Sequence, residues 1–319
     1  MRVRTMLSLS IALVASAAFS FAPGAQAAPG SLRILLVETQ SATEFSNFTT
    51  ALRAEPGVAA VDAFDADAST PNASTLAGYD LIVSTGDSDY QDAALYGNRL
   101  ADYIDAGGAV IQFAYDNWDN DGAHPTGRFE SGGYPPFIPG PNDNDDTTLG
   151  ELLVPTSPLL AGVTSFSTGL NTTDALTPGA TLLAKYTDGR NAIATKGRVV
   201  SVTSTPGYDG DAPPAQINPI SAAARLARNT GNVLGRHTVV VKRKGRGSGA
   251  VKSAAGIKCG KTCSAAVPSN TSIALKAKPK RGSSFARWKG VPGCKKKPKC
   301  SLTPIANITV KAKFTKKRR

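Results

Sequence analysis

The distribution of charged residues divides this chain of 319 residues into two parts. From residue 238 onward there are 23 Lys and Arg residues and no Asp or Glu, whereas all 24 acidic residues lie between Glu38 and Asp211. All four cysteines also lie in the basic part. Parts that differ this much in charge and in cysteine content predict two domains, an acidic one over residues 31–236 and a basic one over residues 238–319.

The N-terminal residues 1–27 have the pattern of an export signal. Arg2 and Arg4 precede an apolar run over residues 6–19, and Ala25-Gln26-Ala27 is a small-x-small cleavage site. A membrane span needs about 20 apolar residues, and neither this run nor any later stretch reaches that length. We expect a secreted or extracellular protein, at the cell surface or free of it, without a transmembrane anchor. An uncleaved N-terminal anchor is the alternative.

Short apolar runs in the acidic domain predict strands. They cover residues 32–37, 58–64, 79–84 and 109–115. Apolar residues at helical spacing separate the first two runs and again the last two, where Gly107-Gly108 is placed like a helix C-cap. Strands that alternate with helices predict an α/β domain with a doubly wound, mostly parallel sheet. A hairpin over residues 182–195, a further strand over residues 198–202 and a helix over residues 221–234 complete the expected domain.

Four short motifs mark this domain in order. They are Tyr79-Asp80-Leu81-Ile82-Val83, Ala106-Gly107-Gly108-Ala109-Val110, Ser157-Pro158-Leu159-Leu160-Ala161-Gly162-Val163 and Gly197-Arg198-Val199-Val200. Together they resemble the class I glutamine amidotransferase-like fold, in particular its trehalose-utilisation-like branch. Catalytic members carry a cysteine at the turn after the strand that ends near Ala114, but the turn here is Phe113-Ala114-Tyr115-Asp116 and the domain has no cysteine. The resemblance therefore implies the fold without the thiolate on which amidase chemistry depends, so we favour a protein that is not an enzyme.

The loop after that turn carries the weak catalytic candidates Asp116, His124 and Glu130. Two carboxylates that face one cleft can act as a general acid and base, so an extracellular hydrolase or sugar-modifying enzyme that uses Asp116, Asp119 or Glu130 is the alternative function. The chain has no Gly-x-Ser-x-Gly elbow for a serine nucleophile. In a loop rich in Pro and Gly, His124 is expected to be an ordinary exposed residue.

The same loop contains half of a calcium-binding pattern. Oxygen ligands at Asn117, Asp119 and Asp121 alternate along the chain and precede Gly122, but the position that should hold a bidentate Glu is Arg128. We therefore expect no cofactor and a solvated acidic loop that binds nothing, with calcium bound by this half-pattern as the alternative. A carbohydrate site at this rim is a third interpretation, with a stacking surface from one of three aromatic residues, Tyr115, Trp118 or Tyr134.

The basic domain has the pattern of a small all-β fold. Residues 308–314 alternate between apolar and polar side chains, which predicts a half-buried strand, and Phe285 and Trp288 are the expected core anchors. Four cysteines in an exported module of this size suggest two disulfides, and sequence alone allows three pairings. We favour Cys259 with Cys263 and Cys294 with Cys300, because each pair brackets a short turn. A zinc site is the alternative.

A second resemblance covers nearly the whole basic domain. Its motifs are Gly256-Ile257-Lys258-Cys259-Gly260, Cys263, Gly282-Ser283-Ser284-Phe285-Ala286-Arg287-Trp288, Cys294, Cys300 and a closing strand at 308–314. In this order they resemble the divergent internalin-type B repeat of bacterial surface and secreted proteins. The resemblance implies a non-catalytic bacterial repeat module that acts as a spacer or an adhesion element. The charge departs from the pattern, because Lys and Arg occupy positions that Ser, Thr and Gly usually fill.

The two resemblances and the charge lead to one functional hypothesis. We expect a secreted or cell-surface binding or adhesion protein whose α/β domain binds a glycan or calcium and whose basic module attaches to an anionic cell-envelope polymer or polysaccharide. No motif indicates sequence-specific recognition of nucleic acid. Two alternatives for the basic charges are simple solvation and docking of the module onto the acidic domain.

Overall fold

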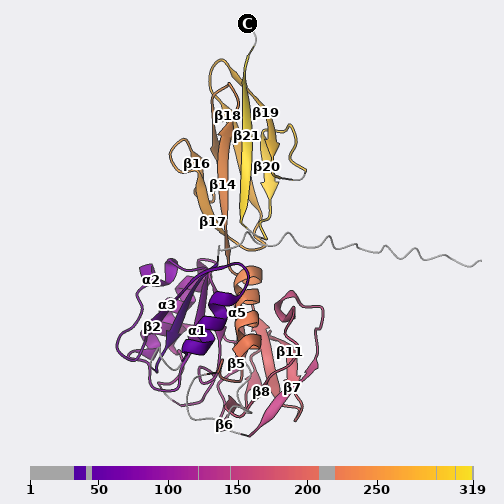
Figure 1. The fold of residues 1–319 in the computed structure, drawn as a ribbon. Coiled ribbons are helices and arrows are strands. Elements are labelled where there is room, and N and C mark those ends of the chain that lie inside the picture. Colours follow the sequence, from indigo (N-terminus) through magenta and orange to yellow (C-terminus); the bar gives the residue numbers. More distant parts are fainter. Residues whose placement is uncertain are drawn as a thin grey trace, which may run out of the picture.

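The computed structural model describes residues 32–40, 45–120, 122–143, 145–207, 220–291, 293–305 and 307–317. The expected export signal lies outside these residues. Among the helices of the described ranges, none is both long and apolar enough to span a membrane. Figure 1 shows two bodies, an α/β domain and a narrow all-β module that extends from one end of it.

A mixed sheet of nine strands forms the centre of the α/β domain, in the order β2-β1-β3-β4-β13-β12-β11-β7-β8. Its parallel strands are β1 (Leu32–Glu38), β2 (Val58–Asp65), β3 (Leu81–Thr85), β4 (Ala109–Gln112) and β13 (Val199–Val202). The antiparallel extension consists of β12 (Asn191–Lys196), β11 (Thr181–Tyr186), β7 (Thr147–Leu152) and β8 (Ser167–Thr168).

The large extension corrects the expectation of a mostly parallel sheet. The four runs predicted as strands are β1 to β4, and the expected hairpin is formed by β11 and β12. The turns at Asp188-Gly189 and at Lys196-Gly197 are short, and a turn of that length joins only antiparallel neighbours. With the antiparallel pairings of β11 with β7 and of β7 with β8, these two hairpins make half of the strand pairings in the sheet antiparallel.

Helices cover both faces of the parallel strands. On one face lie α1 (Ser46–Ala54) and α5 (Ile220–Leu234), and on the other lie α2 (Ala73–Ala77) and α3 (Ala93–Asp105). The near-continuous apolar sequence of β1 follows from this double cover, because Ile34 packs toward the first pair and Leu35 toward the second.

The segment from 118 to 146, which holds the loop after the turn that follows β4, contains short elements. They are α4 (Gly127–Ser131), β5 (Phe137–Ile138) and β6 (Asn142–Asp143). β5 pairs with β10 (Ala175–Leu176) and β6 pairs with β9 (Asn171–Thr172), while the 3-10 helix η1 (Pro158–Leu160) lies against α5. The loop is thus tied to a second connection that precedes β11.

The basic module is a sandwich of two four-stranded sheets. The first sheet has the order β17-β14-β21-β19 and the second β16-β15-β18-β20. The strands are β14 (Arg236–Lys244), β15 (Gly249–Lys252), β16 (Lys258–Cys259), β17 (Ser264–Pro268), β18 (Ile273–Pro279), β19 (Ser283–Lys289), β20 (Lys299–Leu302) and β21 (Ile308–Lys316). Apolar side chains of both sheets form one core, in which Trp288 is buried and Phe285 is only partly buried.

The module stands on the edge of the α/β sheet where the parallel strands begin. Ser269 N donates to Gly235 O at 2.8 Å, and an Arg198 guanidinium nitrogen donates to Ser269 O at 3.2 Å. Gly107 packs directly against Pro268, so that a Cβ added at position 107 would lie only 2.2 Å from Pro268 Cγ. Because Gly107 and Arg198 precede β4 and β13, the carboxyl ends of these strands point away from the module (Figure 1).

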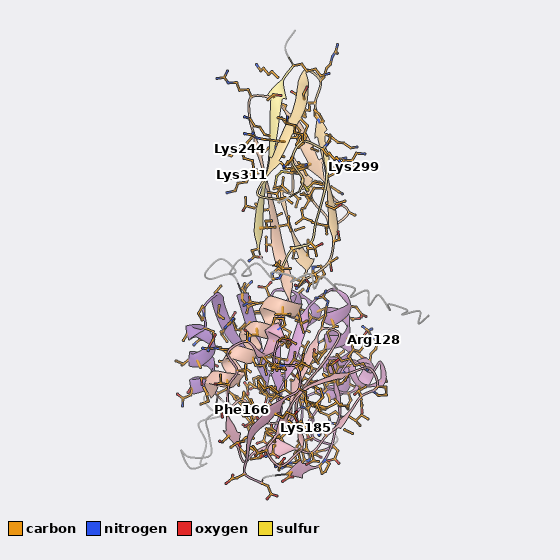
Figure 2. The ribbon with its side chains drawn as sticks, turned by 90° about the vertical axis from the view of Figure 1, so that its right-hand side faces the viewer. Arg128, Phe166, Lys185, Lys244, Lys299 and Lys311 are labelled. Atoms are coloured by element: carbon orange, nitrogen blue, oxygen red, sulfur yellow. A yellow bond between two sulfur atoms is a disulfide. The ribbon has the colours of Figure 1, made fainter. Side chains whose placement is uncertain are left out.

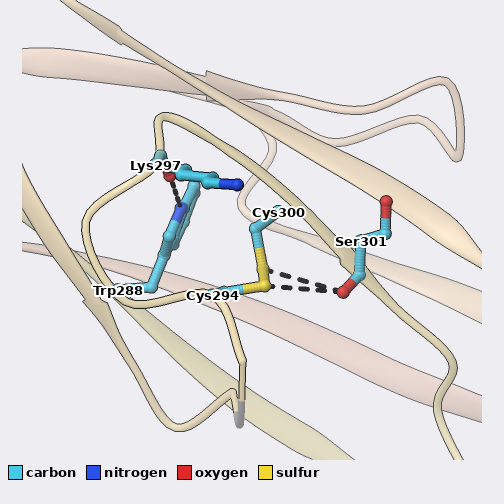
Figure 3. Close-up of a disulfide and its surroundings, with 5 residues drawn as sticks. All are labelled: Trp288, Cys294, Lys297, Cys300 and Ser301. Carbon is cyan, nitrogen blue, oxygen red and sulfur yellow. Dashed lines mark hydrogen bonds between the residues drawn. A yellow bond between two sulfur atoms is a disulfide. The ribbon is translucent and has the colours of Figure 1, made fainter.

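Two disulfides staple the module, and they are the expected pairs. Cys259 bonds to Cys263 and Cys294 to Cys300, so none of the four cysteines is left for the zinc alternative. Figure 3 shows the second disulfide beside Trp288, whose indole nitrogen donates to Lys297 O at 2.9 Å. The turn that carries Lys297 is therefore fixed to the core both by the disulfide and by the indole.

We predict that Cys294→Ala/Cys300→Ala lowers the free energy of unfolding by about 2 kcal/mol, because the chain-entropy model gives that order for a loop this short. Urea denaturation followed by the fluorescence of Trp288 measures the change. The matched control is Thr303→Ala, an exposed position that follows β20. Equal stability of the double variant and the control would contradict the stapling role.

Candidate functional site

The carboxyl ends of β1, β3, β4 and β13 form the edge of the sheet opposite the module. In open α/β sheets, ligands bind outside this edge. Several polar side chains are buried there, among them Glu38, Thr85, Gln112 and Thr203. Thr85 Oγ1 donates to Ala114 O at 2.9 Å, which ties the end of β3 to the turn after β4. This edge is therefore the candidate site of the α/β domain.

Asp116 lies at the centre of a buried hydrogen-bond network. Its Oδ1 accepts from the Tyr90 hydroxyl at 2.6 Å, and that hydroxyl lies 3.2 Å from Ser84 Oγ. The Tyr96 hydroxyl lies 3.0 Å from the same Ser84 Oγ. Asp116 Oδ2 is also buried and has no hydrogen-bond partner. The network thus satisfies one oxygen of the carboxyl group and leaves the other unused.

Burial controls the protonation of this network. Loss of solvation raises the pKa of Asp116 to about 7, and its hydrogen bonds offset only part of that effect. Burial and the nearby Asp116 carboxyl also raise the pKa of Tyr90 and of Tyr96 well above the usual tyrosine value. At neutral pH, Asp116 is therefore poised between its charged and neutral forms while both tyrosines stay protonated.

Gly86 closes the backbone over this carboxyl. A Cβ on Gly86 would lie 2.5 Å from Ala123 O and 3.2 Å from Asp116 Oδ1. Tyr90 N also donates to Gly122 O at 2.8 Å. The segment at 122–123 therefore lies against the end of β3, directly beside Asp116, and any side chain at position 86 would push it away.

The structure brings His124 and Glu130 together, with His124 Nε2 4.0 Å from Glu130 Oε1. The expectation that His124 is exposed is wrong, because it is only 6% exposed and its Nδ1 lies 3.2 Å from Asn120 O. Residues 123–125 are buried together, so the ring of His124 lies inside with its neighbours. Glu130 remains about half exposed. These two residues form a pair of their own, whereas Asp116 belongs to the tyrosine network.

The candidate calcium ligands have different surroundings. Asn117 is buried and its Nδ2 donates to Val202 O at 3.1 Å, so its amide ties the loop to β13. Asp119 is exposed, and Asp121 lies outside the described residues. The residues that the structure describes contain no group of three His, Cys, Asp or Glu able to hold a metal ion. Calcium binding stays a prediction, and it depends on Asp121.

The three aromatic residues considered for carbohydrate stacking are mostly packed. Tyr115 is buried, and its ring centroid lies 5.7 Å from that of Trp118. Tyr134 stacks on Phe129, and its hydroxyl donates to Asp105 at 2.8 Å. Trp118 and Tyr134 are both partly exposed, but Arg128 also lies over the Tyr134 ring, so Trp118 is the better candidate for a stacking surface.

A second buried carboxyl, Asp174, was not identified from the sequence. It is 5% exposed, its Oδ2 accepts from Thr172 Oγ1 at 2.7 Å, and its Oδ1 has no hydrogen-bond partner. Burial raises its pKa to about 8. Because Thr172 N donates to Thr203 O at 2.9 Å, Asp174 also lies near the carboxyl end of β13. No motif distinguishes it in the sequence, because Asp174 reaches this edge only through long-range contacts of β9, the pairing with β6 and the bridge between Asn171 and Ser204 among them.

The basic module has a groove of about 570 Å³ that is lined by cations and by glycine backbone. The lining includes Lys242, Arg243, Lys244 and Lys280, of which all four are exposed. The glycine-rich turn is needed because a Cβ on Gly245 would lie 2.1 Å from Phe314 O. All ion pairs of the described residues lie in the α/β domain, so the module's cations are not neutralised by its own side chains.

Comparison with known proteins supports the resemblance of the basic module. Residues 246–318 match the model of the divergent InlB B-repeat domain, which indicates a bacterial surface-associated domain. No curated protein matches the chain in sequence.

Solved structures resemble the chain at low sequence identity. A cytoplasmic protein from Salmonella typhimurium is 13% identical with a TM-score of 0.49, covering 64% of this chain and 99% of that one. A ThuA-like protein from Bacteroides uniformis is 13% identical with a TM-score of 0.47, covering 67% and 96%. A glutamine amidotransferase from Thermotoga maritima is 12% identical with a TM-score of 0.39, covering 54% and 74%.

We predict that Asp116→Asn changes how stability depends on pH. In the protein with Asp116, the carboxyl group of the unfolded chain ionises from about pH 4, whereas the carboxyl group of the folded state keeps its proton up to about pH 7. The folded state therefore loses stability as the pH rises through this window, and the loss is complete above it. Because the variant has no proton to lose, its stability relative to the native protein should rise by on the order of 4 kcal/mol between pH 4 and pH 8.

Denaturation midpoints across this pH range test the prediction. The control Asp67→Asn removes an exposed carboxyl of the same domain and should follow the native curve. A constant difference between Asp116→Asn and the native protein at all pH values would show that Asp116 ionises normally.

Proposed function

We propose that this protein is secreted and is held to the cell envelope by its basic module, which binds anionic polymers. The observation that carries the proposal is the uncompensated charge of the module, with 23 Lys and Arg residues and no acidic residue. A field of one sign attracts polyanions and raises their rate of encounter. The repeat-domain match and the two disulfides are compatible with secretion or a surface location.

The arrangement of the two domains favours an external partner over the acidic domain. The module meets that domain end-on, through the backbone near Gly235 and Ser269. Its long faces extend away from the acidic domain (Figure 1). Internal docking of the basic faces would need a different arrangement of the domains, so we place the polyanion on these faces.

Calorimetric titration of the full chain with inorganic polyphosphate tests this function. We expect binding whose affinity falls by about a thousandfold between about 50 and 200 mM salt, the scale for six or more phosphate contacts. Neutral dextran is the control and should give no heat of binding. Absence of binding to polyphosphate, or an affinity that salt does not change, would contradict the proposal.

We place the ligand of the α/β domain at the carboxyl edge of its sheet. The candidate ligands are a glycan that stacks on Trp118 and a calcium ion bound by Asp119, two residues that closely follow the buried Asp116 in the chain. The hydrolase alternative is favoured by a separate observation. Asp116 has one oxygen without a partner and a pKa of about 7, which suits a general acid or base at neutral pH.

Titration with calcium and with a glycan panel, combined with a hydrolysis assay on the same glycans, distinguishes these interpretations. For a binding domain we expect heat of binding without turnover, and Asp116→Asn should then keep its affinity. Turnover that falls by at least a hundredfold in Asp116→Asn but persists in Asp119→Asn would instead establish the hydrolase, since general acid–base catalysis contributes on that scale.

A further inference from the structure

The lysines of the second sheet of the module lie in one row across all four strands. Lys252 of β15 pairs with Lys258 of β16 on one side and with Lys276 of β18 on the other. Lys276 pairs in turn with Lys299 of β20. All four side chains are exposed. We call this row the four-lysine ladder, and its steps are about 4.8 Å because that is the spacing of paired strands.

The first sheet carries two shorter rows on its outer face. Lys311 of β21 pairs with Lys242 of β14 and with Lys289 of β19. Lys313, two residues further along β21, pairs with Lys244 and with Arg287 in the same way. We call these rows the three-cation ladders. Since strand residues two apart point to the same side, both ladders lie on one face.

The ladders of the two sheets face in opposite directions. Residues next to the ladders, such as Val310 and Ala312 on β21 and Leu275 and Ala277 on β18, are buried in the single core between the sheets. The ladder side chains must therefore point outward from both sides of the sandwich. Figure 2 shows this directly, with Lys244 and Lys311 on one side of the module and Lys299 on the other.

Rows of like charge raise the free energy of the folded module. Like charges directly opposite each other on paired strands are destabilising. The steps are also shorter than the Debye length of about 8 Å at physiological ionic strength, so salt screens them only in part. The module contains no acidic residue that could intervene. A polyanion laid along a ladder neutralises adjacent charges together, and a linear chain of repeated anions matches a row better than an isolated ion does.

We infer that the module binds two linear anionic envelope polymers at once, one on each face, and thereby cross-links them. This inference rests on the proposed attachment to anionic polymers and adds the site and its valence. The ladders contain nine lysines and one arginine. Lysine acts as a point charge on a flexible stem and lacks the planar fork of arginine, so the ladders recognise repeated charge on phosphate or carboxylate groups without base or sugar specificity.

Light scattering of the full chain with long-chain polyphosphate tests the cross-linking. We expect scattering to pass through a maximum as polymer is added and to fall when either component is in excess, as for any bivalent linker. The variant Lys252→Gln/Lys276→Gln removes the centre of the four-lysine ladder, and Lys311→Gln/Lys313→Gln removes the centres of both three-cation ladders. Each variant should still bind polyphosphate by calorimetry, at about half the stoichiometry, but should lower the scattering maximum at least tenfold.

The matched control is Lys295→Gln/Lys296→Gln, which removes the same charge from exposed positions outside the ladders and should scatter like the native protein. If the native protein binds polyphosphate but all three variants scatter alike, the inference fails while the proposed attachment stands. If the native protein does not bind at all, the attachment itself fails. Parallel titrations with polygalacturonate distinguish carboxylate from phosphate polymers, and tighter binding of short duplex DNA than of either polymer would overturn the envelope assignment.

Discussion

Repulsion among its own cations is the main force that the basic module must overcome in order to fold. In the part of the chain that the structure describes, ion pairs are confined to the α/β domain, so the module must fold against this repulsion by burial, sheet pairing and its disulfides. The strict alternation of β18 and β21 sends Lys outward and buries Leu275, Val310 and Phe314 in one core. A core of this size is marginal, which explains why two disulfides close its turns.

The contact between the two domains determines which surfaces of each domain are left for a ligand. Arg236 begins β14 directly after α5 and donates to Tyr79 O at 3.0 Å, while the buried His237 next to it has its pKa lowered by burial and stays neutral. This contact uses the edge of the sheet where strands begin. The polar edge around Asp116 and the cationic faces of the module therefore lie at separate places, so that a polymer on the module does not cover the α/β site.

Much of the fold could be read from the sequence because its signals are local. Apolar runs and period-two alternation gave the strands, and the spacing of Cys259 from Cys263 and of Cys294 from Cys300 allowed the right pairing to be favoured. The antiparallel half of the large sheet was underestimated because β7 and β8 contain few apolar residues, so no apolar run marks them as strands. The burial of His124 could not be predicted either, since polar residues in a Pro and Gly loop give no periodic signal.

The burial of the two carboxyl groups and the alignment of the lysines were the features least predictable from the sequence. Asp116 stands out in the sequence only through its position after a strand, and Asp174 does not stand out at all, yet both are buried with one oxygen unpartnered. The positive charge of the module could be counted from the sequence, but the lysine ladders could be found only by knowing which residues of paired strands lie opposite each other. Register is set by the buried face of each strand and by the turns that join neighbouring strands, but most ladder pairs join strands that are not consecutive in the chain, such as β14 with β21 and β18 with β20.

The two buried carboxyls carry a further implication for the α/β domain. An asparagine at position 116 could accept the same hydrogen bond from Tyr90 and would stay neutral at every pH, so a purely structural role does not require a carboxyl group there. Retaining one costs stability that grows as the pH rises from about 4 and reaches its full size above about pH 7, because burial disfavours the charged carboxylate in the folded state. Such costs concentrate at sites where a proton or a ligand is exchanged. The edge of the sheet beside Asp116 and Asp174, far from the module, is therefore where the chemistry of this domain should be sought.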